Sequence, residues 1–315
     1  MRRLKLKKCK RVHSLHFAPD GRRLLAVGGY EVRGVQAAVW LDPHAGAEVR
    51  RLDVLAECAA VTPDLTRLAL GGAHHYETGE SVQWADTEAE GEWVPVPVVE
   101  SVPENSVFGL AFDAGGTRLA VGYGRQSLDQ PGSYEWDYRV AVWRFDPPGF
   151  AGDVAAAEGA AVLAFGPDGR RLAFTGGIDG DPAVYVHDLT TGGRAWEYHP
   201  KGTRTRALTF DTAGRLAVAN ARTVSVLAPD GGEPLFTLPG HTGQVNAVAL
   251  SPDGRHLLTA SHDGAIRIWD AATGSPVKSF DWGIGPVTAV AFAPDGLTCA
   301  AAGLNGRLVL WDVDG

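Results

Sequence analysis

The sequence predicts an all-β fold, a seven-bladed β-propeller made of four-stranded antiparallel sheets. One sequence motif recurs along the 315 residues: an alternating apolar segment, a Pro-Asp-Gly-like turn, a second apolar segment, and a third apolar segment that ends in Trp. The shared turn position of its seven copies falls 40 to 53 residues apart, at Gly21, Leu65, Gly116, Gly169, Gly214, Gly254 and Gly296. A period in the forties made of short strands is typical of propeller blades rather than helical repeats. The 40 Gly and 19 Pro supply the turns that such a chain needs.

Each copy divides into three strands, here called a, b and c, and a fourth, d, that leads into the next copy. In the copy at 240–270 the turn between strands a and b reads Pro-Asp-Gly at 252–254. Proline presets φ, the aspartate side chain bonds nearby backbone, and glycine takes a positive φ without a Cβ clash. Strand a carries small residues such as Ala247, as expected where blades converge. Strand c ends in the bulky Trp269, as expected where blades diverge.

We expect all seven blades to form one domain, 1–315, without a linker. The expected blade boundaries are 11–54, 55–100, 101–157, 158–200, 201–239, 240–282 and 283–315. The last copy stops after its strand c, whereas residues 1–10 precede the first copy and read Leu-Lys-Leu-Lys at 4–7. This alternation predicts that 1–10 is the outer strand of the last blade and closes the propeller.

The charge distribution argues against nucleic acid or a membrane as the partner. The formal net charge is -8 and the pI is about 5.7, whereas binding to polyanions requires a basic surface. Seven basic residues crowd the first eleven positions. On an exposed edge strand, such residues discourage sheet-to-sheet aggregation. The alternative for this segment is binding to nucleic acid or to an anionic membrane.

Cysteine usage and hydropathy indicate the compartment. Cys9, Cys58 and Cys299 lie far apart and form no Cys-x-x-Cys pair, so we expect no disulfide framework, no thiolate metal site and a reducing compartment. No apolar run approaches the roughly 20 residues of a membrane span. We therefore expect a cytoplasmic protein, and the excess of Arg over Lys with abundant Ala indicates a bacterial source.

The most regular copies carry a family likeness. Its residues are Gly240-His241, Asp263 and Trp269-Asp270 in one copy and Trp311-Asp312 in the last. Through them the sequence resembles the WD-repeat β-propeller family over essentially the whole chain. Other copies depart from the pattern: His187 and Leu227 replace the Trp at the end of strand c, and Leu65 replaces the turn glycine.

The resemblance implies a structural relay formed by His241, Thr259, Asp263 and Trp269. An indole N–H only donates, a hydroxyl accepts and donates, an imidazole does both and a carboxylate accepts, so such a set satisfies every polar group. The alternative is a hydrolase triad with Thr259 or Ser261 as nucleophile. No nucleophile elbow or second oxyanion donor accompanies the set, so we expect no catalytic residues here.

The segment His74-His75-Tyr76-Glu77 could suggest a metal site. Adjacent histidines on extended backbone point in opposite directions, and no third ligand has a suitable spacing. We interpret the segment as an exposed loop. The glycine pairs near 28, 71 and 176 end strands and lack the following helix that phosphate binding needs. We therefore expect no metal and no cofactor.

The connections between strands b and c are longer in the first three copies than in the later ones. They are tight in later copies, as at 262–265, but read GYEVRGVQ, GAHHYETGE and YGRQSLDQPGSYEWDY in copies one to three. In a propeller these connections share one rim with the d-to-a connections. Their candidate interface anchors are Tyr30, Arg33, His74, Tyr76, Tyr123, Arg125, Tyr134, Trp136 and Tyr138. Aromatic residues and Arg are typical of interfaces; the alternative is that these rings pack their own loops.

One column of the aligned copies shows no shared residue type. It lies near the start of strand a, between columns that stay apolar or small, and holds His13, Glu57, Phe108, Ala161, Arg206, Asn246 and Thr288. The column is either a binding ring around the axial mouth or a set of unconstrained solvent-facing positions.

The function that these observations favour is a non-catalytic scaffold, monomeric by itself. It would bind an unidentified protein or peptide through the rim, chiefly through the b-to-c connections of blades one to three. The alternative is a lactonase-like or lyase-like propeller enzyme with an acidic or metal site formed by Glu57, Glu104 and Glu158. These glutamates are not equivalent among the blades, which weakens the alternative.

Overall fold

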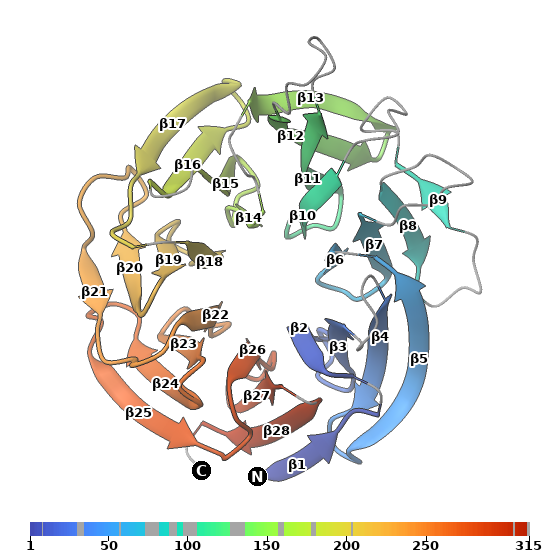
Figure 1. Ribbon diagram of the computed structural model, residues 1–315, viewed down its shortest axis with the longest axis vertical. Helices are drawn as coiled ribbons and strands as arrows, with labels where there is room; N and C mark the ends of the chain where they lie inside the picture. The colour runs from blue at the N-terminus through green and yellow to red at the C-terminus, as the bar shows by residue number, and fades with distance from the viewer. Residues whose placement is uncertain are drawn as a thin grey trace. The chain divides into compact units, whose positions relative to one another are not determined.

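The computed structural model describes most of the 315-residue chain. The described ranges are 1–7, 9–29, 35–56, 58–72, 82–87, 93–96, 106–126, 136–156, 161–177, 181–202, 204–304 and 306–313. Within them lie 28 strands in seven four-stranded antiparallel sheets (Figure 1). The predicted fold is confirmed: the protein is an all-β seven-bladed propeller. In the described part of the chain, no helix is long and apolar enough to cross a membrane.

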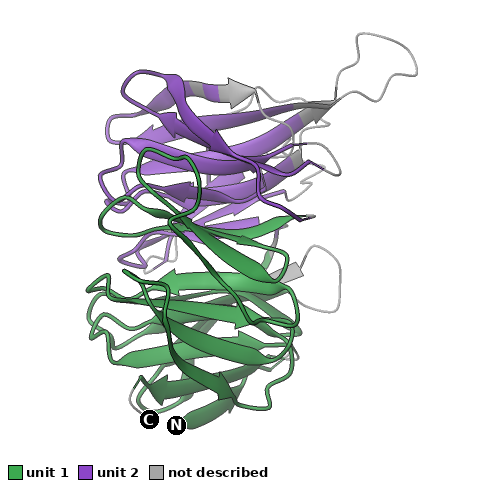
Figure 2. Ribbon diagram, turned by 90° about the vertical axis from the view of Figure 1, so that its left-hand side faces the viewer, with its two compact units in different colours: residues 1–55, 204–315 green, residues 56–203 purple. Residues whose placement is uncertain are grey.

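The chain divides into two compact units (Figure 2). Unit 1 comprises 1–55 and 204–315, and unit 2 comprises 56–203. Unit 1 holds four of the sheets and unit 2 holds three. The sheets are numbered here as blades 1 to 7 in the order of their strands a.

Unit 1 contains blades 1, 5, 6 and 7. Blade 1 is β2 (Arg11–Phe17), β3 (Leu24–Gly29), β4 (Val35–Asp42) and β5 (Ala47–Leu55). Blade 5 is β18 (Thr205–Phe210), β19 (Leu216–Asn220), β20 (Thr223–Leu227) and β21 (Phe236–Leu238). Blade 6 is β22 (Val245–Leu250), β23 (His256–Ser261), β24 (Ala265–Asp270) and β25 (Pro276–Asp281). Blade 7 is β26 (Val287–Phe292), β27 (Thr298–Gly303), β28 (Arg307–Asp312) and β1 (Arg2–Lys5). The a strands β18, β22, β26 and β2 lie side by side in that order (Figure 1).

Unit 2 contains blades 2, 3 and 4. Blade 2 is β6 (Cys58–Val61), β7 (Arg67–Gly71), β8 (Val82–Asp86) and β9 (Val94–Pro95). Blade 3 is β10 (Ser106–Phe112), β11 (Arg118–Gln126), β12 (Trp136–Phe145) and β13 (Pro148–Ala156). Blade 4 is β14 (Leu163–Phe165), β15 (Arg171–Gly176), β16 (Ala183–Asp188) and β17 (Gly193–Tyr198). The a strands β6, β10 and β14 are again neighbours.

The N-terminal strand completes blade 7, as predicted. β1 pairs antiparallel with β28, and just beyond it the Leu6 N–H donates to the Gly306 carbonyl at 2.8 Å. Leu6 is buried, and Leu4 packs against the same apolar cluster. The alternation of apolar and basic residues therefore directs one side of this strand into the core, where burial of apolar area stabilises the closure.

The turn between strands a and b keeps one position at positive φ even where glycine is absent. In blade 2 this position is Leu65, with φ 60°, a conformation that strains an L-residue with a side chain. The Leu65 side chain is only 1% exposed, and its carbonyl accepts a hydrogen bond from the Thr87 hydroxyl. Burial of the leucine side chain offsets the strain.

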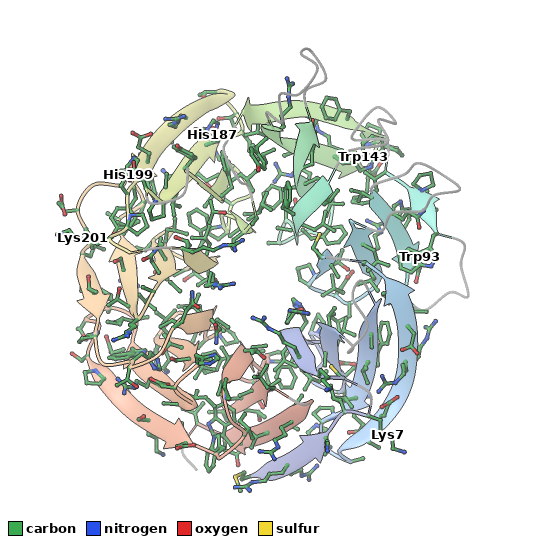
Figure 3. All side chains as sticks on the ribbon, in the orientation of Figure 1. Lys7, Trp93, Trp143, His187, His199 and Lys201 are labelled. Carbon is green, nitrogen blue, oxygen red and sulfur yellow. The ribbon has the colours of Figure 1, made fainter. Side chains whose placement is uncertain are left out.

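In blades 1, 4, 5, 6 and 7 the end of strand c is buried whether or not it carries Trp. Trp269, Trp311 and the replacement residues His187 and Leu227 are all buried. The ring of His187, labelled in Figure 3, lies 5.2 Å from that of Phe174. Burial, and then the charge of Arg194, lower the pKa of His187, so the ring is neutral and packs as an aromatic group. The fold thus requires a large side chain at this position and does not require the N–H donor of an indole ring.

Candidate functional site

The structure brings the four relay residues together within blade 6. His241 precedes β22, Thr259 lies on β23, Asp263 lies in the turn between β23 and β24, and Trp269 lies on β24. His241 Nδ1 is 3.1 Å from Asp263 Oδ2, and His241 Nε2 is 2.8 Å from Thr259 Oγ1. The Trp269 indole N–H donates to the same Thr259 oxygen at 2.9 Å. The four side chains therefore form one continuous chain of hydrogen bonds.

The protonation states follow from the partners of each atom. The Thr259 hydroxyl accepts from the indole and donates to Nε2, so His241 carries its proton on Nδ1 and donates it to the Asp263 carboxylate. Burial lowers the pKa of His241, and Asp263 only partly opposes this. Burial alone would raise the pKa of Asp263, but hydrogen bonds from the Ala265 and Thr242 backbone and from His241 bring it to about 2. The pair is thus a neutral imidazole beside a charged carboxylate.

The hydroxyls near His241 are not placed to attack a substrate. Thr259 and Ser261 are both 0% exposed, and a nucleophile must reach the scissile atom of a bound substrate. Ser261 Oγ also accepts a hydrogen bond from the Asp263 N–H at 3.2 Å. The geometry of this set therefore favours the relay over the hydrolase triad.

The predicted rim residues are described only in part. Tyr30, Arg33, His74, Tyr76 and Tyr134 lie outside the described residues, as do Glu57, Glu104 and Glu158 of the alternative hypothesis. Arg125 lies on β11 and Trp136 on β12, and of these two residues only the backbone is described.

The two rim residues with described side chains differ in exposure. Tyr123 is 6% exposed and belongs to an apolar cluster of unit 2 with Val121 and Ala141. Tyr138 is half-buried, and its ring lies 5.6 Å from that of Phe108. Tyr123 thus packs inside unit 2, whereas Tyr138 keeps part of its side chain at the surface.

Strands b and c of blade 3 are longer than those of blade 6. β11 has 9 residues and β12 has 10, against 6 each in β23 and β24. The ladder continues through Tyr123↔Arg139 and Gly124↔Tyr138 to Gln126↔Trp136. The rim end of this hairpin is therefore a regular, hydrogen-bonded extension of the sheet up to Trp136.

The variable column coincides with a β-bulge. In blades 1, 3, 5, 6 and 7 the pairing of strands a and b skips one residue of strand a. The skipped residues are His13, Phe108, Arg206, Asn246 and Thr288. A bulge residue has no partner directly opposite on the neighbouring strand. Strand pairing therefore does not restrict the residue type at this position in the same way in every blade.

Two bulge side chains join neighbouring blades of unit 1. Asn246 Nδ2 donates to the Val287 carbonyl of blade 7 at 2.8 Å, and the Thr288 hydroxyl donates to the Val12 carbonyl of blade 1 at 2.7 Å. In blades 1 and 5 the bulge residues His13 and Arg206 are exposed instead. The sequence showed the column but not its cause, because a bulge is visible only in the register of paired strands.

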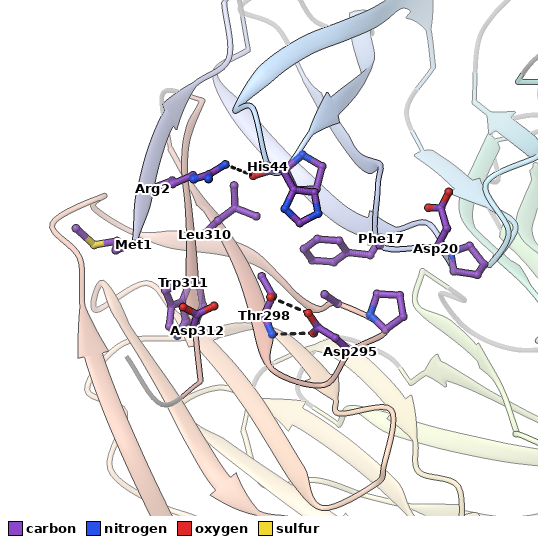
Figure 4. A pocket seen from close by; sticks show the side chains of 15 residues that line it. Met1, Arg2, Phe17, Asp20, His44, Asp295, Thr298, Leu310, Trp311 and Asp312 are labelled. Atoms are coloured by element: carbon purple, nitrogen blue, oxygen red, sulfur yellow. Dashed lines mark hydrogen bonds between the residues drawn. The ribbon is translucent and has the colours of Figure 1, made fainter.

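A pocket of about 580 Å³ lies in unit 1 beside the a-to-b turns of blades 1 and 7 (Figure 4). Its walls include Phe17, His44 and Leu310 and the carboxylates of Asp20 and Asp295. Both carboxylates accept hydrogen bonds within their own turns, Asp20 from Arg22 N–H and Asp295 from Leu297 and Thr298. These carboxylates thus stabilise turns, and the pocket presents a mixed lining without a dominant charge.

Among the described residues, no group of three or more His, Cys, Asp or Glu side chains could hold a metal ion. The His74-His75 segment and Glu57, Glu104 and Glu158 lie outside that part of the chain.

The family model that matches this chain covers blade 6, which carries the relay, and blade 7. The WD domain, G-beta repeat model matches residues 232–270 and 274–312. An uncharacterised WD repeat-containing protein of Synechocystis is 31% identical over 133 residues, 42% of this chain and 36% of its own length. Ribosome assembly protein 4 of Saccharomyces cerevisiae is 45% identical over 42 residues, 13% of this chain and 8% of its own. A meiotic recombination protein of Schizosaccharomyces pombe is 31% identical over 113 residues, 35% of this chain and 36% of its own.

The sheets, the a-to-b turns and the relay of blade 6 define a repeat protein of the β-propeller class. Residues 232–270 and 274–312 match the WD40 repeat, and the chain as a whole resembles the WD40-repeat β-propeller family in its seven four-stranded sheets. The matched segments span 36% of the length of the Synechocystis and Schizosaccharomyces pombe relatives and 8% of the length of the Saccharomyces cerevisiae relative. Members of this family commonly bind proteins and are usually non-catalytic.

Proposed function

We propose that this protein is a non-catalytic scaffold that binds a protein or peptide partner through the rim formed by the b-to-c and d-to-a connections, chiefly those of blades 1 to 3. The observation that carries the proposal is the extended b–c hairpin of blade 3, with strands of 9 and 10 residues. The strand ladder of this hairpin is hydrogen-bonded as far as Gln126 and Trp136. A partner that docks there loses less conformational entropy than on a free loop.

Surface aromatics at the base of this hairpin support the proposal. Phe108 and Tyr138 are half-buried, and their rings pack at a tilt with centroids 5.6 Å apart. Aromatic residues with one packed face and one accessible edge are typical interface anchors. The other candidate anchors of this rim are Tyr30, Arg33, His74, Tyr76, Arg125, Tyr134 and Trp136.

The proposal also includes the compartment. We place the protein in the cytoplasm of a bacterium, where thiols stay reduced. Cys9, Cys58 and Cys299 are free thiols in the structure, and burial raises the pKa of Cys299 to about 12, so that thiol stays protonated and acts as a small apolar residue.

The test is capture of partners from bacterial lysate by the immobilised protein. The double variant Trp136→Ala/Tyr138→Ala is expected to lose the captured proteins and to lower the melting temperature by no more than ~4 °C. Phe150→Ala is the matched control, because Phe150 is 49% exposed on β13, the outer strand of the same blade. If both variants capture the same proteins as the parent chain, the rim of blade 3 is not the binding surface.

A further inference from the structure

The outer part of blade 7 carries basic side chains on the face toward blade 6. In the register of β1 with β28, Arg3 lies opposite Val309 and Lys5 lies opposite Arg307. Residues directly opposite each other, and residues two apart along a strand, point to the same face of a sheet. Val309 belongs to the apolar cluster formed by blades 6 and 7, so Arg3, Lys5 and Arg307 share the face toward blade 6. All three side chains are exposed.

Hydrogen bonds join this face to blade 6 and to the connection that follows it. The Arg307 guanidinium donates to the Gly283 carbonyl at 3.2 Å. The Lys278 ammonium of β25 donates to the Val313 carbonyl at 3.4 Å and lies 5.5 Å from the ring centre of Phe280. A fourth basic side chain, contributed by blade 6, therefore lies along the junction of the two blades. The basic side chains of this junction, here called the basic seam, are Arg3, Lys5, Lys278 and Arg307.

Within the described part of the chain, the exposed members of the basic seam have no counter-ion. No described carboxylate forms an ion pair with Arg3, Lys5 or Arg307. Lys5 and Arg307 instead face each other directly across the ladder, and like charges in that position repel each other. An anionic side chain placed beside them would relieve this repulsion.

The same strand presents an open edge. β1 is the last strand of its sheet, which has the order β1-β28-β27-β26 (Figure 1). Among the described strands, only β28 pairs with β1. The outer side of an edge strand carries N–H and C=O groups that can pair with another strand. A strand added to β1 would place every second side chain on the face toward blade 6, next to Arg3 and Lys5.

The charges determine which strand can be added. Basic residues on an edge discourage pairing with apolar or basic segments, whereas Glu or Asp at alternate positions would form cross-strand pairs of opposite charge. Nucleic acid requires an extended basic surface, but the whole chain carries -8 and β1 has only four residues. The basic residues that protect this edge from aggregation therefore also favour an acidic strand over other strands.

We propose that the outer edge of β1 binds an extended segment of the partner protein as an added strand, with Asp or Glu at alternate positions beside the basic seam. The inference rests on the proposed scaffold function and adds to it the chemistry of the partner and a second contact area in unit 1. Main-chain hydrogen bonds supply affinity, and Arg3 and Lys5 select acidic segments.

The test is binding of a fluorescent peptide of alternating Glu and Val to the full chain, measured by anisotropy at low salt. One reference peptide has Gln in place of Glu. The other has Pro in place of Val, which keeps the charges but disfavours a paired strand. The Glu-Val peptide is expected to bind at least ~tenfold more tightly than either reference, and added salt is expected to weaken its binding.

Two variants test the basic seam. Arg3→Gln/Lys5→Gln keeps the apolar residues that close the propeller and is expected to remove the preference for Glu over Gln. Arg307→Gln is expected to weaken binding of the Glu-Val peptide by ~threefold.

The matched control is Arg204→Gln/Arg206→Gln. It removes the same two positive charges at exposed positions of unit 1 outside the basic seam. Its affinity for the Glu-Val peptide is expected to stay within ~twofold of the parent. Unchanged melting temperatures of all variants exclude unfolding as the cause of a loss.

The inference is overturned if the Glu-Val peptide binds no more tightly than the Gln peptide or the Pro peptide, or if the control variant loses as much affinity as Arg3→Gln/Lys5→Gln. It is also overturned if a single-stranded oligonucleotide or a phosphatidylserine vesicle displaces the peptide and binds more tightly. Failure of this test leaves the lysate capture by Trp136 and Tyr138 unaffected. If lysate capture fails while the acidic peptide binds along β1, the rim of blade 3 is wrong and the basic seam stands.

Discussion

Blades 6 and 7 hold the same buried tryptophan in two different ways. In blade 6 the indole N–H of Trp269 donates to Thr259, which continues to His241. In blade 7 the positions of Thr259 and His241 are taken by Ala301 and Gly283. Among the described residues, the Trp311 indole nitrogen has no hydrogen-bond partner.

Aromatic packing takes the place of hydrogen bonds in blade 7. The ring of Trp311 lies 5.6 Å from Phe280 and 6.1 Å from Trp282, and these two rings stack at 5.2 Å. All three belong to one apolar cluster of unit 1. The comparison teaches that the fold requires a large buried ring at this position, and that the polar relay is one of two ways to fix it.

The two blades also differ in how their sheets are assembled. The four strands of blade 6 follow one another in sequence, whereas blade 7 takes its outer strand β1 from the N-terminus. The contribution of blade 7 to stability therefore depends on a pairing between distant parts of the chain, which the apolar residues of the N-terminal segment hold in place.

The largest effect is expected from Leu6→Asp, which breaks this pairing. Leu6 is 3% exposed within the cluster that joins blades 7 and 1, and a buried carboxylate without a partner costs about 3–4 kcal/mol. Urea unfolding measures the loss, with the exposed Lys5→Asp as control. Equal stability of Leu6→Asp and the parent would show that the pairing of this segment with blade 7 does not stabilise the protein.

Thr259→Val is expected to cost about 2–4 kcal/mol, because it leaves the Trp269 N–H and His241 Nε2 buried without a partner while keeping the side-chain shape. Thr259→Ser keeps the hydroxyl and should recover most of the stability. The measurement is the free energy of unfolding in urea. A Val variant as stable as the Ser variant would mean that the relay does not stabilise blade 6.

Substitution of each tryptophan by Phe compares the blades directly. Trp269→Phe removes a donor and leaves Thr259 with one partner fewer, whereas Trp311→Phe removes an indole N–H that has no described partner. We expect Trp269→Phe to cost about 1 kcal/mol more than Trp311→Phe. An equal cost of the two substitutions would mean that aromatic volume alone matters in both blades.

The relay is expected to make stability depend on pH. The pKa of His241 lies below 6.5 in the fold, so the unfolded chain binds protons first and stability falls as the pH drops below 6.5. The pKa of Asp263 is about 2 against 3.8 for the ordinary carboxyl, so its contribution is present above pH 4 and is lost toward pH 2. The difference in melting temperature between the parent and Asp263→Asn should therefore narrow as the pH falls from 4 toward 2. A difference that widens toward pH 3 would contradict this assignment.

The smallest effect is expected from calcium. The enzyme hypothesis assigns a divalent cation to Glu57, Glu104 and Glu158, whereas the scaffold hypothesis assigns none. A thermal-shift titration with calcium should leave the melting temperature unchanged, with EDTA-treated protein as the reference. A stabilisation that saturates with calcium, and that disappears in Glu104→Gln, would favour the enzyme hypothesis.

The fold could be predicted because every blade requires similar residue types at equivalent positions, and these positions recur along the chain. The a-to-b turn needs a positive φ in every copy, and strand c needs a large or tightly packed residue, so both appear as periodic signals even where Leu65 and His187 replace the expected types. The closure was predictable from alternation alone, because a half-buried edge strand directs every second residue into the core. These are local rules, and local rules can be read from sequence.

The site was less predictable because it depends on pairs that are distant in sequence. His241 and Thr259 come together only when the segment before β22 lies against β23. The bulges that release Arg206 and His13 require the strand register. Tyr123 resembled a surface anchor in sequence but packs into the core of unit 2, since residues of both kinds alternate along an extended hairpin.

The most direct test of the account compares lysate capture by Thr259→Val and by Trp136→Ala/Tyr138→Ala at a temperature at which both variants are folded. The relay stabilises blade 6, whereas the rim is proposed to bind the partner. We therefore expect Thr259→Val to keep the captured partners despite a lower melting temperature. We expect the rim variant to lose them while its melting temperature is nearly unchanged. Loss of the partners by folded Thr259→Val, together with their retention by the rim variant, would contradict this expectation.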